Sequence, residues 1–326
     1  MGIIRYVMEL QTKALYNLLR LNYAQDPSLP CEEWQVEDLR PVPIDALFKR
    51  LKDAGLLMDL AAFHRYAEES DSPESLAELL LVDLEEPEIY DRLYLVLFEI
   101  WRRLLPEKQS LSIFCDELDH QIWLFDAGKL DSDEPIQDAL ANLIEILEEN
   151  VDAGAKPVEV FATMGSYSSQ DLFSFLVDYI SELLDGDNEL YAAELIEHFS
   201  PYVLDDGWFA LLRIRLLAFT DPVKANQQLA ALFEKKDLSL DLLLEALRFI
   251  VVFGEKPLFL TAIRLSLPLL ETREEFEELL TFCADYFRRR DREDLELETS
   301  KLLKRASPFS LNEAQKFEKL LQVQLK

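Results

Sequence analysis

The second half of the chain, from residue 170 to residue 326, contains apolar segments with helical periodicity that come in pairs, with short polar breaks between them. The first segments of successive pairs begin roughly 35 residues apart, which is the period of stacked helix–turn–helix repeats. A single hairpin of this kind cannot bury its own apolar face, so it needs neighbouring hairpins to form a core. The pattern predicts helices at Asp171–Leu184, Glu189–Phe199, Trp208–Phe219, Pro222–Phe233, Leu240–Val252, Pro257–Leu269, Glu274–Arg288, Glu293–Arg305 and Leu311–Leu325.

The composition favours an all-α protein. Only 8 of the 326 residues are glycine, while half of the chain is apolar and Leu, Glu and Ala are abundant. The most hydrophobic segment, Ile89–Leu105, is interrupted by five charged residues and is too short to span a bilayer, so we expect a buried central helix there. The three cysteines are far apart and form no CxxC pair, which fits a reducing, cytoplasmic location.

The formal charge of −30 is unevenly distributed along the chain. Between residues 104 and 212 there are 24 acidic residues against three lysines, a net charge of −21. Such a field repels the phosphates of nucleic acids and anionic lipids and attracts basic proteins over about a Debye length. We therefore expect no nucleic-acid partner and no membrane insertion. A basic protein partner fits the charge, although acidic residues also simply keep solvated helix faces soluble.

The first half of the chain predicts helices without a regular period. A helix is expected at Ile3–Leu21, a proline-rich extended connector at Gln25–Pro43, and a capped helix start at Ser72–Pro73. Trp34 should pin the connector to the protein surface, with an exposed hook for a partner as the alternative. The glycine- and serine-containing stretch 151–169 is the expected domain boundary, which divides the chain into an irregular helical domain, 1–165, and a helical-repeat domain, 166–326.

The stretch from Glu277 to Pro308 resembles the tetratricopeptide class of helical repeats. Leu280, Cys283, Ala284 and Phe287 stand where that family places the large, apolar, small and aromatic residues of its first helix, and Pro308 stands where the family closes a repeat. Pro201 closes the first repeat, which begins at Gln170, in the same way, whereas Glu296 and Glu189 replace the small residue usual in the second helix. The resemblance implies a right-handed stack of hairpins, an α-solenoid, that holds a peptide or a partner protein in a concave groove.

No residue pattern in the chain predicts catalysis or cofactor binding. The sequence contains no dinucleotide fingerprint, phosphate-binding loop, zinc-protease motif or nucleophile elbow. Each histidine has a carboxylate one helical turn away, and Glu117 to His120 has the Glu-x-x-His spacing of di-iron bundles. Those bundles need a second copy of the motif, which the chain lacks, so we expect no metal, no cofactor and no catalytic residue. The aromatic residues of the repeats, Phe219 and Phe253 included, are expected in the core.

A set of arginines on otherwise apolar helices is the candidate partner-binding site. Arg215 and Arg248 are one repeat period apart, and Arg288 takes the same place when its repeat is aligned on Pro308. The resemblance to tetratricopeptide repeats implies that this position faces the groove, where the three guanidinium groups could bind a carboxylate. Arg213 and Arg264 are close enough in the pattern to assist. The alternative is that each arginine pairs with a carboxylate of the chain itself.

These features together predict a non-enzymatic protein–protein interaction module, such as an adaptor, a scaffold or a chaperone-like binder. One rival is an all-α enzyme with its site in a helical funnel, because a fold alone does not exclude chemistry. Another is a peptide-sensing regulator. A cluster of titratable groups that converge in a deep pocket would favour the enzyme, and an open groove without such a cluster would favour the binding module.

Overall fold

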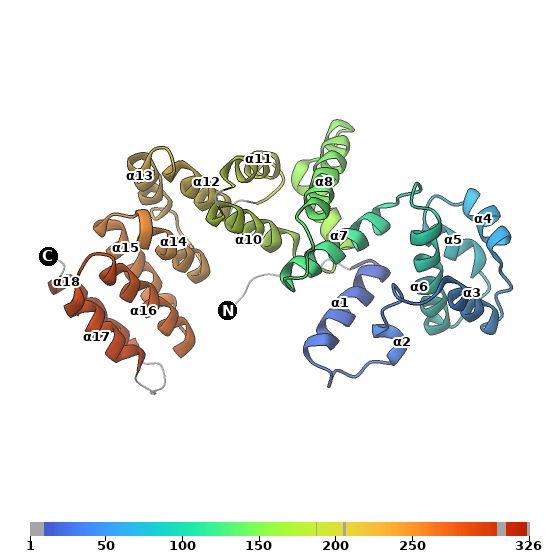
Figure 1. The fold of residues 1–326 in the computed structure, drawn as a ribbon, viewed down its shortest axis with the longest axis horizontal. Helices are drawn as coiled ribbons and strands as arrows, with labels where there is room; N and C mark the ends of the chain where they lie inside the picture. The colour runs from blue at the N-terminus through green and yellow to red at the C-terminus, as the bar shows by residue number, and fades with distance from the viewer. Residues whose placement is uncertain (1–9, 187, 205–206, 305–310, 325–326) are drawn as a thin grey trace. The chain divides into compact units, whose positions relative to one another are not determined.

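The protein is all-α in a computed structural model that describes residues 10–186, 188–204, 207–304 and 311–324 (Figure 1). No strand occurs among these residues, which confirms the predicted fold class at this level. No helix in the described ranges is long and apolar enough to cross a membrane. The helices are α1 (Thr12–Gln25), α2 (Glu33–Val36), α3 (Ile44–Asp53), α4 (Leu60–Glu68), α5 (Pro73–Leu80), α6 (Pro87–Leu104), α7 (Leu111–Asp126), α8 (Glu134–Asp152), α9 (Pro157–Tyr167), α10 (Leu172–Asp185), α11 (Glu189–Phe199), α12 (Trp208–Ala218), α13 (Pro222–Leu232), α14 (Leu240–Phe253), α15 (Lys256–Ser266), the 3₁₀ turn η1 (Leu267–Leu269), α16 (Arg273–Arg288), α17 (Glu293–Leu303) and α18 (Leu311–Gln324).

The chain divides into two compact units, residues 1–175 and residues 176–326. The division falls inside α10, ten residues beyond the boundary expected at 165/166. The stretch expected to be a linker contains α9, which packs against α7 and α8. Pro157 fits the first turn of that helix, where its missing N–H has no role, so a proline-containing segment that reads as a break forms a helix instead.

Unit 1 is built around α6, as the sequence predicts. Every residue of α6 from Leu93 to Trp101 is buried, and α3 and α5 pack against this helix. The indole N–H of Trp101 donates to the carbonyl oxygen of Lys108 (3.0 Å), so the largest buried ring has its polar atom satisfied. At the start of α5, Ser72 accepts from the backbone N–H of Ser75 with a proline at the first turn, which confirms the predicted cap.

Two predicted segments of unit 1 differ in the structure. The first helix begins at Thr12 and continues to Gln25, and residues 3–9 of the expected segment Ile3–Leu21 lie outside the described residues. The proline-rich connector contains the one-turn helix α2, which a capping box between Glu32 and Gln35 stabilises. Since a capping box satisfies backbone donors at both ends of the turn, it forms a helical turn where proline content alone predicts extended chain.

Unit 2 contains the predicted helical pairs. Within it α12 packs on α13, α14 on α15, and α16 on α17, and α14 also contacts both α12 and α16 (Figure 1). The core includes a parallel stack of Phe259 on Tyr286, whose ring centroids are 3.6 Å apart, with Phe287 edge-on to both rings. Cys283 and Ala284 of the tetratricopeptide-like stretch are buried here, while Pro308 lies outside the described residues.

Candidate functional site

The predicted arginine site contains a buried guanidinium group at its centre. Arg215, on α12, is 7% exposed. Its guanidinium donates to Asp185 of α10 (2.7 Å), to Glu245 of α14 (2.8 Å), and to the hydroxyl and carbonyl oxygens of Ser181 (3.0 and 3.3 Å). Four acceptors on two neighbouring helices therefore bind the guanidinium group of Arg215. This arrangement agrees with the alternative interpretation, in which the arginine pairs with carboxylates of the chain itself.

Arg248 shares these carboxylates but remains accessible. Its guanidinium lies 2.9 Å from the other oxygen of Asp185 and 3.7 Å from Glu245, and its side chain is 57% exposed. The structure thus brings the two arginines, 33 residues apart in sequence, to one cluster, because α12 packs against α14. Burial raises the pKa of Glu245, and the two guanidinium groups oppose this shift.

The other three predicted arginines lie apart from this cluster. Arg288 pairs with Asp285 (2.9 Å) and Glu296 (2.8 Å), Arg213 donates to the hydroxyl of Ser200, and Arg264 donates to Thr261 at 3.5 Å. No interaction in the described part of the chain joins them to Arg215 or Arg248. The grouping of all five stays a prediction, and the geometry singles out Arg248 as the accessible cation beside a buried one.

Exposed apolar side chains lie at the carboxyl ends of the same two helices. Phe219, which follows α12, is 42% exposed, and Val252 and Phe253 of α14 are 50% and 40% exposed. The rings of Phe219 and Phe253 are 6.2 Å apart. Val252 is four residues after Arg248, so the two side chains share one face of α14. The expectation that these two phenylalanines are core residues is wrong, because Phe219 is the C-cap residue of α12 and Phe253 is the last residue of α14, and both side chains are exposed there.

A second charged cluster, in unit 1, surrounds a buried carboxylate. Asp116 of α7 is 3% exposed and lies 2.7 Å from the ammonium of Lys13 and 2.6 Å from the guanidinium of Arg40, while Asn17 donates to it at 2.8 Å. Burial favours the neutral acid, but these two cations outweigh that effect and hold the pKa of Asp116 well below its usual range. Sequence reasoning paired Asp116 and Glu117 with His120, whereas both carboxylates bind Arg40.

One turn further along α7, Asp119 is similarly buried, and no cation among the described residues pairs with it. Its oxygens accept from the hydroxyl groups of Ser168 (2.5 Å) and Ser169 (2.6 Å) and from the backbone N–H groups of Ser169 (2.8 Å) and Gln170 (3.4 Å). Burial raises the pKa of Asp119, and the serine donors oppose this only in part. This carboxylate anchors the serine-containing stretch that sequence reasoning treated as a linker.

The connector between α1 and α3 borders three cavities of unit 1. Arg50 holds Glu37 through two hydrogen bonds (2.7 and 2.8 Å), and Arg103 donates to the carbonyl oxygens of Leu39, Arg40 and Val42 (2.6, 2.7 and 2.6 Å). These arginines fix a proline-rich segment into a rigid wall. Its residues line each of the cavities.

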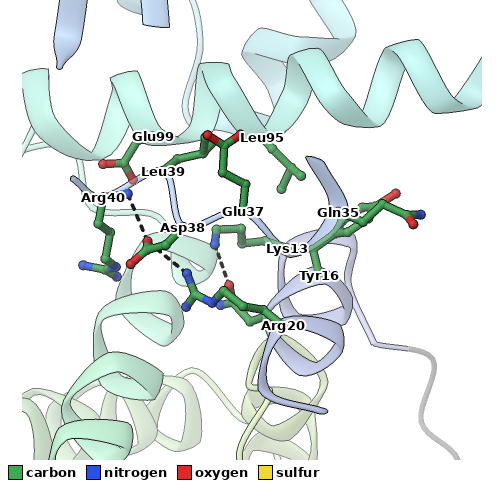
Figure 2. A pocket seen from close by; sticks show the side chains of 11 residues that line it. Lys13, Tyr16, Arg20, Gln35, Glu37, Asp38, Leu39, Arg40, Leu95 and Glu99 are labelled. Atoms are coloured by element: carbon green, nitrogen blue, oxygen red, sulfur yellow. Dashed lines mark hydrogen bonds and ion pairs between the residues drawn. The ribbon is translucent and has the colours of Figure 1, made fainter. Parts of the chain in front are cut away.

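The smallest cavity, of about 30 Å³, is drawn in Figure 2. It lies between α1, the connector and α6. Arg20 pairs with Asp38 at 3.1 Å, and Lys13 donates to the amide oxygen of Asn17 at 2.6 Å. The space holds about two water molecules. A cavity of this volume is too small for an organic ligand.

The second cavity, of about 170 Å³, includes Asp116, Asp119, His120 and Trp123. The imidazole of His120 stacks on Trp123 with ring centroids 5.9 Å apart, and burial lowers its pKa. The enzyme alternative would use this cavity, since titratable groups converge on it. Both carboxylates, however, already accept the hydrogen bonds described above, which leaves His120 as the titratable group available to a ligand.

No arrangement of three or more His, Cys, Asp and Glu side chains in the described ranges could hold a metal ion. Comparison with known proteins finds no matching family model, no matching curated protein and no matching solved structure.

Proposed function

We propose that the protein is a non-enzymatic protein-binding module and that unit 2 binds an acidic segment of a partner along α12 and α14. The observation that carries this proposal is the position of Arg248. Its guanidinium is more than half exposed, two carboxylates hold it in place, and it shares a helix face with the exposed Val252. A cation beside an apolar patch suits a segment that carries a carboxylate and an adjacent apolar side chain.

The proposed groove requires the helical pairs of unit 2 to stack as repeats. The contacts of the first helices support this arrangement, because α14 contacts both α12 and α16. Among the second helices α13 contacts α15, and α15 then contacts α18. A tetratricopeptide-like α-solenoid has this contact order. The partner would then lie across the first helices, where Arg215 and Arg248 occupy equivalent positions one repeat apart.

The buried charged groups already make hydrogen bonds and ion pairs within the chain, which fits a binding role better than catalysis. The carboxylates that could act as acids or bases, Asp116 and Asp119, are held by internal donors within unit 1. A general base needs a free lone pair within reach of a substrate proton. The enzyme alternative therefore depends on His120, whose imidazole stacks on Trp123.

Affinity capture from native lysate with charge-reversed variants tests the proposal. The full chain, Arg248→Glu and the control Arg65→Glu are used as baits; Arg65 is an exposed arginine of unit 1. A partner that wild type and the control retain and that Arg248→Glu loses supports the proposed face. A partner that Arg248→Glu retains in full amount contradicts it.

A further inference from the structure

The largest of the three cavities, about 380 Å³, lies in unit 1 between the connector, α3 and α6. Its apolar lining comes from Trp34 and Leu39 of the connector and from Ile89, Leu93 and Val96 of α6. Small-molecule sites are typically cavities of about 300–1,000 Å³ with mostly apolar walls and a few polar groups. This cavity has the volume and the lining of such a site, and it is separate from the face of unit 2 proposed to bind a partner.

The walls of the cavity are fixed before any ligand arrives. Leu93 and Val96 belong to the buried centre of α6, where each is 4% exposed. The indole of Trp34 packs on Tyr16 with ring centroids 5.5 Å apart, and its N–H donates to Glu32 at 2.9 Å. Because rigid walls lose little conformational entropy on binding, a ligand that fits them keeps more of its contact energy.

Four charged side chains border the cavity, and they are not equivalent. Glu37 and Arg50 neutralise one another through their paired hydrogen bonds. Within the described part of the chain, Arg92 and Asp53 make no hydrogen bond or ion pair with another side chain. Asp53 ends α3, with Arg50 and Lys49 three and four residues before it on the same helix face.

The surroundings of Arg92 on α6 are less charged than those of Asp53. Three of its four neighbours at helical spacing are the apolar residues Ile89, Leu95 and Val96, and the fourth is Glu88. Two of these apolar neighbours, Ile89 and Val96, line the cavity with it. Asp53 thus lies one helical turn from two cations but pairs with neither, while Arg92 lies one turn from mainly apolar residues. The geometry points to a site for a small apolar carboxylate, with its hydrocarbon part against Trp34 and α6 and its carboxylate on Arg92.

Calorimetric titration of the full chain with three probes of equal length tests the assignment: octanoate, octanol and octylamine. We expect octanoate to bind tightest, because an exposed guanidinium forms charge-assisted hydrogen bonds with a carboxylate. Arg92→Ala should weaken octanoate about tenfold, the equivalent of about 1.4 kcal/mol, and leave octanol unchanged. Arg65→Ala, an exposed arginine on α4, should leave all three affinities unchanged.

A variant that fills the cavity distinguishes this site from others on the chain. Ile89 is 37% exposed, so Ile89→Trp places extra volume in the cavity mouth without disturbing the buried core. We expect it to weaken octanoate and octanol alike. Octanoate binding that is unaffected by both Ile89→Trp and Arg92→Ala would overturn the site. Octylamine binding that is tighter than octanoate binding would overturn the inferred negative charge of the ligand. A short peptide with adjacent Leu and Glu that binds tenfold tighter than octanoate would assign the cavity to a protein partner and overturn the small-molecule ligand.

Discussion

The two charged clusters of this protein have buried central groups of opposite charge. In unit 1 a buried carboxylate, Asp116, lies between the cations of Lys13 and Arg40, and all three side chains are at most 16% exposed. In unit 2 a buried guanidinium, Arg215, lies between Asp185 and Glu245, and the cluster continues to Arg248 on the surface. We call the first cluster closed because its two cations are mostly buried, although Arg40 also binds the partly exposed Glu117. The second cluster is open, because it presents a fixed cation to solvent. We propose that burial of the outer partners, more than the number of ion pairs, distinguishes a cluster that stabilises the fold from one that can also bind a partner.

Removal of the central carboxylate should give the largest effect. Asp116→Ala leaves Lys13 and Arg40 beside each other without their shared anion, and breaking a buried ion pair in this way costs about 3–5 kcal/mol. We expect this loss in the free energy of unfolding, measured by urea denaturation of the full chain. Asp126→Ala, an exposed carboxylate on the same helix, is the matched control and should change the free energy by less than about 0.5 kcal/mol.

Removal of the central guanidinium in unit 2 should cost less. In Arg215→Ala the outer carboxylates are half-exposed or partly exposed, so water replaces some of the lost interaction. A decrease of about 2–3 kcal/mol in the free energy of unfolding is expected. If Arg215→Ala is as damaging as Asp116→Ala, the contrast between a closed and an open cluster does not hold.

The two buried carboxylates of α7 should respond to pH with opposite signs. The pKa of Asp116 is lowered in the folded state, so its contribution is present above the unfolded value of about 3.9 and is lost as the pH falls further. The pKa of Asp119 is raised, so protonation stabilises the folded state as the pH falls from neutral towards about 4. Wild type should therefore gain stability relative to Asp119→Asn over that range, and lose stability relative to Asp116→Ala below it.

Urea denaturation at several pH values measures both differences. A gap between wild type and Asp119→Asn that stays constant from neutral pH to about 4 would show that Asp119 has an ordinary pKa in the folded protein.

Substitution of the exposed arginine should have the smallest effect on stability. The ion pairs of Arg248 are more than half exposed on the arginine side, and exposed pairs contribute about 0–1 kcal/mol. We expect Arg248→Ala to change the free energy of unfolding by less than about 1 kcal/mol. If Arg248→Ala lowers the free energy of unfolding by more than this and Arg65→Ala does not change it, Arg248 belongs to a closed cluster, like that of Asp116.

The helical character of the chain could be predicted from residue periodicity, but the clusters could not. The apolar stripe identifies α14 because such a pattern is local in the sequence. Runs of apolar residues identify α12 and α6, because such runs need burial. The contacts that make the clusters join distant residues, such as Arg40 to Asp116 and Ser168 to Asp119. With 63 acidic residues in the chain, no pattern marks which carboxylates meet an arginine. Arg215 and Arg248, which are one predicted repeat period apart in the sequence, do meet in one cluster, because α12 contacts α14.

The most direct test of the contrast between the clusters measures binding and stability on the same two variants. The partner recovered by wild type is titrated against Arg248→Ala and Asp116→Asn at a temperature where both variants are folded. We expect Arg248→Ala to bind at least tenfold more weakly with an unchanged melting temperature, and Asp116→Asn to bind as wild type does with a lowered melting temperature. Weakened binding by Asp116→Asn together with full binding by Arg248→Ala would contradict the assignment of the two clusters.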